Sequence, residues 1–371
     1  MTLPSAHHTT RSAPPARLAR TISPALAAAL LLLVAWAAAL CLGAVSAAAQ
    51  PPDEPGAVVL MYHRFGEDAY PSTSIRLAQF EAHLAELRKP RYTVLPVPEI
   101  LAALREGRPL PQRTIGITID DAYASVYHQA WPRLRTAGFP FTLFVSTEPV
   151  HQGYRDMLSW EQLREMVRGG GVTIGNHTVS HLHMPDHDAA RNRRELEEAS
   201  RRIAAELGTA PTLFAYPFGE ASLRVMETVA AAGFTTAFGQ HSGVLRPGGN
   251  PLYLPRFALN EHYGEMSRFR LVANALPLPV TEQTPRDPLV APGDNPPRLS
   301  FTVAEGVTGL ERLDCYVSGQ GRMELKREGA RRFTGRPARP FSPGRTRINC
   351  TAPGPDGRWR WLGMQFYVQA G

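Results

Sequence analysis

Between Ala57 and about Phe257, short apolar runs alternate with amphipathic stretches, and this alternation restricts the folds open to the chain. The expected strands are Ala57–Met61, Thr114–Ile119, Phe141–Val145, Val172–Ile174, Leu213–Ala215 and Thr235–Ala237. The expected helices are Leu77–Leu87, Ala124–Ala137, Trp160–Val167 and Arg191–Leu207. Strands that alternate with helices favour an α/β fold, in which helices cover the outside of a parallel sheet or barrel. In such folds the chemistry gathers at the carboxyl ends of the strands.

A different pattern follows residues 277–297, a proline-rich segment that we interpret as a linker. Residues 298–371 contain short alternating segments between glycine and proline turns, which predict a small all-β sandwich. Cys315 and Cys350 are the only cysteines beyond residue 50. In an exported protein such a pair is expected to form a disulfide, and two buried thiols are the alternative.

The first 49 residues are typical of a targeting segment. Three arginines and no acidic residue accompany an apolar run from about Ile22 to Ala47, and small residues follow it. This pattern predicts a cleaved signal peptide, although the run is nearly as long as the ~20 residues that a membrane anchor needs. Either alternative delivers the rest of the chain outside the cytoplasm, and we expect the α/β domain to occupy residues 50–276.

The formal net charge of +7 is concentrated near the carboxyl end. Residues 298–371 contain thirteen Lys and Arg residues against six Asp and Glu residues. This excess is compatible with an anionic glycan or an envelope surface as partner, and equally with an ordinary solvated surface. Export and the lack of a nucleic-acid-binding motif argue against nucleic acid. A membrane would be contacted only through an uncleaved leader.

Two neighbouring carboxylates, Asp120 and Asp121, stand at the end of an expected strand. Successive side chains on a strand point in opposite directions, so one carboxylate can bind a cation while the other acts as a base. Alone, an Asp-Asp pair is more often a turn or a helix cap. His177 and His181 follow another expected strand and would share one face if the segment were helical. With one carboxylate they supply the His-His-Asp set of a catalytic metal site that keeps an open position.

The third motif is the turn 216–219, Tyr-Pro-Phe-Gly, which follows the apolar run Leu213–Ala215. Proline and glycine in such a turn can direct backbone N–H groups toward a cavity, as an oxyanion hole requires. A purely structural turn is the alternative. His183 and His187 lie near the metal-binding histidines, and we expect both to face solvent.

These three motifs resemble the polysaccharide deacetylase family with NodB homology, also called carbohydrate esterase family four. The family's Thr-Phe-Asp-Asp-Gly corresponds to Thr118-Ile119-Asp120-Asp121-Ala122, its paired histidines to His177-Thr178-Val179-Ser180-His181, and its Arg-x-Pro-Tyr-Gly to Ala215-Tyr216-Pro217-Phe218-Gly219. The resemblance covers residues 57–260. It implies a distorted (β/α) barrel and the hydrolysis of N-acetyl groups from amino sugars.

The resemblance also implies a role for each matched residue. Asp120 would be the general base that activates water, and the backbone N–H of Phe218 would help to stabilise the oxyanion. Asp121, His177 and His181 would bind a divalent metal, zinc before cobalt or nickel. The expected substrate is an N-acetylated polysaccharide outside the cytoplasm, either poly-N-acetylglucosamine or peptidoglycan, and acetate would be released.

The sequence departs from the family where the third motif begins and just after the two carboxylates. Ala122 replaces a glycine, so the backbone after the carboxylates is expected to differ. Ala215 replaces an arginine that orients the base in relatives. Arg256 is our candidate for its replacement, although a surface salt bridge would also explain an arginine there.

The family's late Leu-x-His motif, which supplies the general acid, is not evident. His63 follows the first expected strand, and exported poly-N-acetylglucosamine deacetylases look similar at this point. We therefore expect His63 to protonate the leaving amine, with His241 and His262 as alternatives. Two other functions remain open: a non-catalytic glycan-binding scaffold that has kept the fold, and an esterase for O-acetyl groups.

Overall fold

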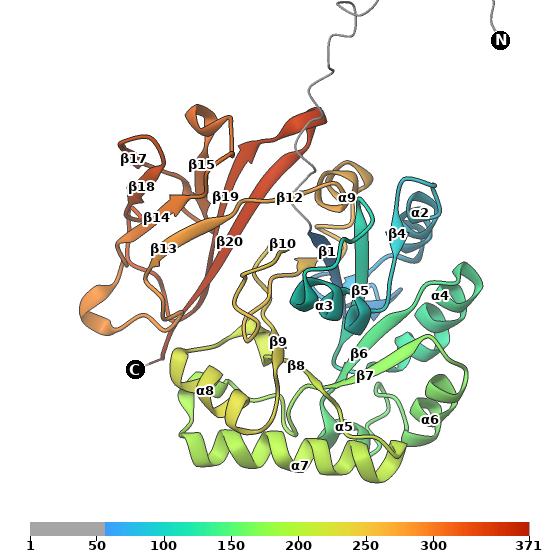
Figure 1. The fold of residues 1–371 in the computed structure, drawn as a ribbon. Helices are drawn as coiled ribbons and strands as arrows, with labels where there is room; N and C mark the ends of the chain where they lie inside the picture. The colour runs from blue at the N-terminus through green and yellow to red at the C-terminus, as the bar shows by residue number, and fades with distance from the viewer. Residues whose placement is uncertain (1–55, 371) are drawn as a thin grey trace, which may run out of the picture. The chain divides into compact units, whose positions relative to one another are not determined.

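A curled, mostly parallel sheet lies at the centre of the computed structural model, which describes residues 56–370 (Figure 1). Its main strands are β1 (Ala57–Tyr62), β5 (Thr114–Asp120), β6 (Phe141–Val145), β7 (Val172–Asn176), β8 (Leu213–Ala215) and β9 (Thr236–Phe238). They run parallel in the order β1-β5-β6-β7-β8-β9. The shorter strands are β2 (Arg64–Phe65), β3 (Ser74–Ile75), β4 (Thr93–Val94), β10 (Val244–Leu245) and β11 (Phe257–Ala258). The six strands expected from the apolar runs are therefore confirmed.

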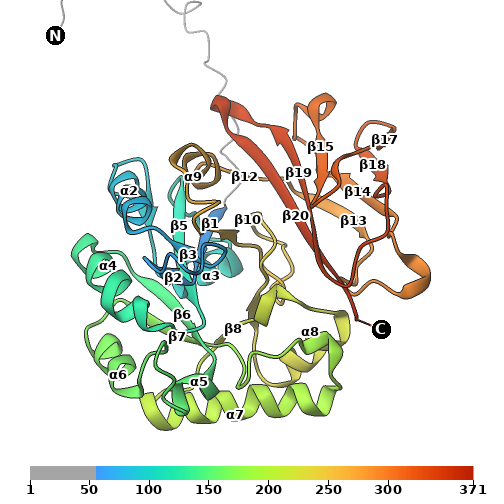
Figure 2. The ribbon, with the colours of Figure 1, turned by 180° about the vertical axis from the view of Figure 1, so that it is seen from behind.

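Helices lie along the outside of this sheet, as Figures 1 and 2 show. They are α2 (Leu77–Leu87), α3 (Val97–Glu106), α4 (Trp131–Ala137), α5 (Thr147–His151), α6 (Trp160–Arg168), α7 (Ala189–Leu207), α8 (Leu223–Ala231) and α9 (Met266–Ala273). One face of α7 is buried through Leu196, Ala199 and Ile203. The helix begins where Asp188 accepts a hydrogen bond from the backbone and ends at Gly208, which is left-handed.

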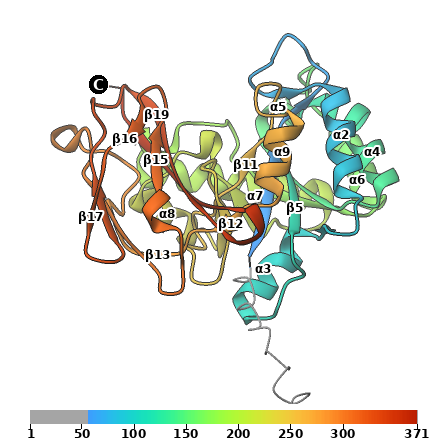
Figure 3. The same cartoon turned by 90° about the horizontal axis from the view of Figure 1, so that it is seen from above.

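Two sheets follow the curled sheet in the chain, and they are antiparallel except where β12 pairs with β20 (Figure 3). One contains β12 (Leu276–Pro277), β15 (Asp314–Val317), β16 (Gly321–Met323), β19 (Gly344–Pro353) and β20 (Trp359–Val368). The other contains β13 (Val280–Thr284), β14 (Leu299–Val303), β17 (Leu325–Glu328) and β18 (Arg332–Gly335). A separate apolar core lies within this region, and Cys315 and Cys350 form the expected disulfide between β15 and β19. The expected fold class, a distorted (β/α) barrel followed by an all-β region, is confirmed. We call residues 276–370 the carboxyl-terminal module.

The proline-rich segment 277–297, for which we expect a linker, takes part in these sheets. It contains β13, and the side chains of Val280 and Val290 are buried. Its non-proline positions still donate backbone hydrogen bonds: Leu278 N to Trp361 O, and Val290 N to Tyr367 O. Prolines between such positions do not prevent pairing at a sheet edge. The domain boundaries thus stay a prediction. Residues 276–284 pair with later strands of the module, β20 and β14.

The leader expected over residues 1–49 lies outside the described residues. Within residues 56–370, no helix combines the length and the apolar character needed to cross a membrane.

Glu86 on α2 is a buried carboxylate with three cationic partners. Lys89 Nζ lies 2.7 Å and Arg270 Nε 3.1 Å from its Oε2, and Arg91 donates to Oε1. Burial alone would raise the pKa of Glu86, but these donors lower it to about 2. Because the folded pKa is below the unfolded one, the ion pairs stabilise the fold above about pH 4.5, and this stabilisation is lost as the pH falls toward 2.

We predict that Glu86→Gln lowers the free energy of unfolding at pH 7 by about 2 kcal/mol, less than a fully buried pair because the cations are half exposed. The difference from wild type should shrink at pH 3, where Glu86 of the unfolded chain is protonated. Urea denaturation at both pH values measures it. The control is Glu81→Gln, also on α2, which breaks an exposed ion pair with Arg133 of α4. A difference that does not change with pH would contradict the assignment.

Candidate active site

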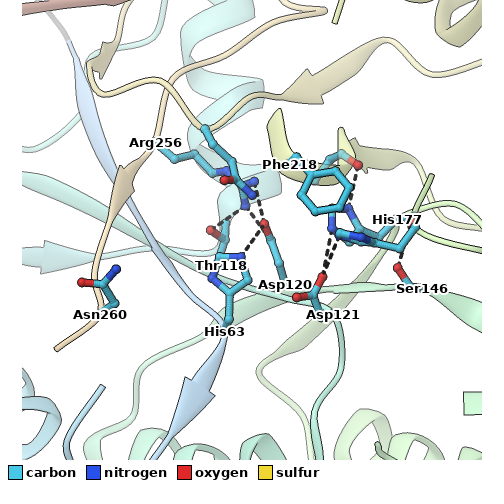
Figure 4. A network of polar contacts seen from close by, with 12 residues as sticks. His63, Thr118, Asp120, Asp121, Ser146, His177, Phe218, Arg256 and Asn260 are labelled. Atoms are coloured by element: carbon cyan, nitrogen blue, oxygen red, sulfur yellow. Dashed lines mark hydrogen bonds and ion pairs between the residues drawn. The ribbon is translucent and has the colours of Figure 1, made fainter. Parts of the chain in front are cut away.

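The predicted site residues meet at the carboxyl edge of the curled sheet (Figure 4). His63 follows β1, Asp120 ends β5 with Asp121 next to it, His177 follows β7, Phe218 lies in the turn after β8, and Arg256 precedes β11. The carboxyl ends of parallel strands share one edge of a sheet, so residues far apart in the sequence converge there. The motifs identified in the sequence thus form a single cluster in space.

Asp120 and Arg256 form a fully buried, two-pronged ion pair. Arg256 Nη1 lies 2.7 Å from Asp120 Oδ1, and Nη2 lies 2.8 Å from Oδ2. Arg256 also donates to Thr118 Oγ1 at 3.1 Å and, through Nε, to Gly239 O at 3.0 Å. Burial alone would raise the pKa of Asp120, but the charge of Arg256, the charges of His177 and His63 and the hydrogen bonds from Arg256 together keep the pKa below its usual value. The carboxylate is therefore ionised and fixed in orientation.

His63 approaches the same carboxylate from β1. Its Nε2 lies 3.9 Å from Asp120 Oδ2, and its side chain is 14% exposed. Burial lowers the pKa of His63, and the charges of Asp121 and Asp120 offset part of this effect. Among the histidines that we considered for the acid, His63 is the one that the described structure brings into contact with Asp120. His241 is buried against the ring of Tyr253 instead, and burial lowers its pKa to about 3.

Asp121, His177 and His181 bring three ligand atoms together, all within 4.8 Å of one another. Asp121 Oδ1 lies 3.2 Å from Nε2 of each histidine. The two histidines reach this point from an irregular loop and not from a helix. His181 itself has φ 55°, and this left-handed backbone turns its ring back toward His177.

The donor set fits a divalent cation. His177 Nδ1 lies 2.7 Å from Ala215 O and must therefore carry the hydrogen, which leaves a lone pair on Nε2. That lone pair faces Asp121 Oδ1, and neither buried atom has a hydrogen-bond partner among the described residues. Two acceptors at 3.2 Å repel unless a cation lies between them. Burial alone would lower the pKa of His177, but the neighbouring carboxylates Asp121 and Asp120 raise it above its usual value.

The site loops concentrate unusual backbone conformations. Among the described non-glycine residues, eight have positive φ, and five of these lie in the three motifs: Asp121, Ala122, Thr178, His181 and Phe218. Such conformations cost of order 1 kcal/mol each and gather where geometry is functional. Ala122 adopts φ 62°, a conformation that glycine takes without steric cost. An alanine therefore holds the left-handed turn in place of the family's glycine.

Several residues that the sequence analysis did not single out fix the histidine loop. Glu195 of α7 accepts hydrogen bonds from the backbone N–H of Val179 and Ser180 at 3.0 and 2.8 Å. Ser146 Oγ donates to His177 O at 2.9 Å. Their sequence positions gave no signal, because a polar residue on an amphipathic helix or at a strand end is ordinary. Thr118 could have been found, since it lies two residues before Asp120 on the same face of β5.

The turn 217–219 faces the histidines. The ring of Phe218 lies 4.4 Å from that of His181 and stacks on that of His183 at 4.2 Å. No described residue accepts a hydrogen bond from the Phe218 N–H. His183 is about half exposed as expected, but its Nδ1 also lies 2.6 Å from the buried Glu220. The turn thus provides this solvent-facing histidine with partners as well.

Comparisons with known proteins agree with this arrangement. Residues 107–237 match the family model for polysaccharide deacetylases. A Bacillus subtilis relative is 25% identical over 176 residues, which are 47% of this chain and 61% of that protein. The poly-beta-1,6-N-acetyl-D-glucosamine N-deacetylase of Escherichia coli K12 is 25% identical over 53% of this chain and 36% of its own length. The matches therefore leave a large part of these relatives uncovered.

Solved structures show the same fold. Streptococcus pyogenes deacetylase PplD, in complex with acetate, superposes with a TM-score of 0.53 at 20% identity over 57% of this chain and 95% of its own. IcaB from Ammonifex degensii gives a TM-score of 0.52 at 28% identity over 60% of this chain and 98% of its own. The chain carries a polysaccharide deacetylase domain of the NodB type.

We predict that His181→Ala weakens zinc binding by more than about 100-fold, since even the loss of an outer partner of a metal ligand costs 10–100-fold. The same change at His183, two residues further on, should leave zinc binding intact. Metal content per chain, measured by mass spectrometry after dialysis against dilute Zn²⁺, separates the two variants. Equal zinc in His181→Ala and wild type would contradict the assignment of this ligand set.

Proposed function

We propose that this chain, through its polysaccharide deacetylase domain, hydrolyses N-acetyl groups of amino sugars in a polysaccharide outside the cytoplasm and releases acetate. The observation that carries the proposal is the buried Asp120–Arg256 pair beside the Asp121, His177 and His181 cluster. A base and a cation site side by side are what amide hydrolysis needs, whereas a binding scaffold needs neither. The names of the relatives support poly-N-acetylglucosamine as the first substrate to test.

Each residue of the cluster receives one task in this proposal. Asp120, kept ionised by Arg256, accepts the proton of the attacking water. Asp121, His177 and His181 hold a divalent metal, zinc first, which would polarise the acetamide carbonyl and acidify water. The Phe218 N–H donates to the oxyanion as the tetrahedral intermediate forms. His63, on the other side of Asp120, gives a proton to the departing amine.

The location and further partners belong to the same proposal. The leader-like pattern of residues 1–49 supports action outside the cytoplasm. The basic residues of the module support an anionic glycan or envelope surface as a secondary partner. One groove of the module is lined by Arg298, Arg312 and Arg336 and by the exposed rings of Tyr316 and Trp359, and it offers charge and stacking surface together.

We predict that the purified full chain releases acetate from β-1,6-linked N-acetylglucosamine oligomers, that a chelator abolishes the release, and that Zn²⁺ or Co²⁺ restores it. Asp120→Asn should lower kcat by at least about 100-fold, at the lower end of what a general base contributes, with metal content unchanged. Peptidoglycan and an O-acetylated glycan are assayed in parallel. Acetate release from the O-acetylated glycan alone would show that the chain is an esterase. If none of the substrates releases acetate, the chain is a non-catalytic scaffold.

The role of His63 can be tested with two substrates that differ in their leaving group. An amine must be protonated before it departs, whereas p-nitrophenolate leaves without a proton. We predict that His63→Ala lowers kcat for acetamide substrates by about 100-fold and leaves hydrolysis of p-nitrophenyl acetate within about threefold of wild type. Asp120→Asn, the matched control, should lower both rates. Equal losses on the two substrates in His63→Ala would show that His63 is not the acid.

A further inference from the structure

The carboxyl-terminal module contacts the turn that carries Phe218. Gln365 on β20 donates through Nε2 to Phe218 O at 3.1 Å and to Gly219 O at 2.7 Å. Arg345 on β19 donates through Nη1 to Phe218 O at 2.9 Å. From the barrel itself, Tyr253 Oη donates to Gly219 O at 2.8 Å. Two of the three side chains that hold these carbonyl groups therefore come from the module.

The donors are themselves fixed in orientation. Gln365 is 2% exposed, and its Oε1 accepts from Arg347 Nε at 3.1 Å, so its Nε2 must face the turn. Residues 347 and 365 are paired across β19 and β20, and the long antiparallel ladder of these strands holds them in register. The outer face of the sheet thus presents a rigid amide to the two carbonyl groups.

Arg345 is anchored in a similar way. Its Nε lies 3.6 Å from the buried Glu220, whose other oxygen lies 2.6 Å from His183 Nδ1. Its guanidinium carbon lies 5.4 Å from the centre of the Phe218 ring. Arg345, Glu220 and His183 are therefore linked around the turn, and they contact both the backbone and the ring of Phe218.

The conformation that these contacts hold is an uncommon one. Phe218 has φ 58° and ψ 2°, in the left-handed region that a bulky residue avoids at a cost of about 1–2 kcal/mol. A hydrogen bond contributes about 1 kcal/mol net, and more when the donor is charged. The hydrogen bonds from the module thus contribute enough free energy to decide whether Phe218 adopts this φ. Together, the φ and ψ angles of Phe218 set how the peptide that carries its N–H is oriented relative to the peptide whose carbonyl group the module holds.

We propose that Arg345 and Gln365 are positioning residues for the reaction. They hold the turn 217–219 in its left-handed conformation, so that the Phe218 N–H is presented to the oxyanion before the substrate arrives. The inference rests on the proposed function for its kinetic consequence, and it makes the module a part of the active site. The barrel alone would bind the metal and the substrate, and it would stabilise the transition state less well.

The test replaces the amide donor of Gln365 and the charged donor of Arg345 by other polar side chains. Gln365→Glu retains the acceptor for Arg347 and loses the amide donor, and Arg345→Gln removes the charged donor. We expect kcat to fall about 10-fold in each variant, below the 10²–10³-fold cost of losing an oxyanion donor outright. KM and zinc content should stay within twofold of wild type. Arg345→Lys, which keeps a charged donor, should recover part of the lost kcat.

Substrate choice separates this role from that of His63, because the oxyanion forms with amides and esters alike. Both variants should lose activity on p-nitrophenyl acetate as much as on the acetamide. The matched controls are Gln320→Glu and Arg332→Gln, which make the same changes within the module, where the partners are Arg339 and Glu282. These controls should retain wild-type kcat. A loss confined to KM, or equal losses in the controls, would overturn the proposal.

A crystal structure of Gln365→Glu with zinc supplies a readout that does not need activity. We expect Phe218 to leave the left-handed region while the metal-ligand residues stay in place. An unchanged turn would overturn the positioning role, even if the wild-type chain released no acetate and the proposed function itself had failed.

Discussion

The buried pair of Asp120 and Arg256 is the interaction on which the rest of the site depends. Both side chains are fully buried, so the charge of either one alone would cost several kcal/mol. The pair links the end of β5 to the start of β11 and thereby joins early and late parts of the barrel at its centre. It also leaves one carboxylate ionised beside a second, Asp121, which has different partners. Two adjacent residues, the last of β5 and the one after it, thus have separate sets of partners.

The sequence was enough for the barrel and for most of this cluster. The apolar runs predicted β1, β5, β6, β7, β8 and β9, because alternation along the chain maps directly onto a parallel sheet. The departures at Ala122 and Ala215 were visible, and Arg256 was the candidate for the arginine missing at Ala215. Arg256 does reach the carboxylate, from another strand, and Ala122 accepts the left-handed backbone. A pattern of residue types does not state which φ a residue tolerates, and it gave a surface salt bridge as an equal explanation for Arg256.

The contacts of the module could not have been predicted from the sequence. Arg345 and Gln365 are 127 and 147 residues from Phe218, and neither belongs to a motif. The prolines of residues 277–297 indicated a linker, yet β13 and the buried Val280 and Val290 tie this segment into the sheets. Long-range pairing of strands decides such contacts, and only the folded chain contains that information.

The distance between the turn and Gln365 along the chain bears on how the protein is made. At 5–20 residues per second a ribosome needs roughly 7–30 s to pass from Phe218 to Gln365. During that interval the strands that carry the base and the metal ligands have emerged, while the strand that supports the turn has not. If the proposed positioning role is correct, a chain that ends before β20 would keep the metal-ligand residues and lack the support of the turn. Its activity would then arrive only after β20 has been made.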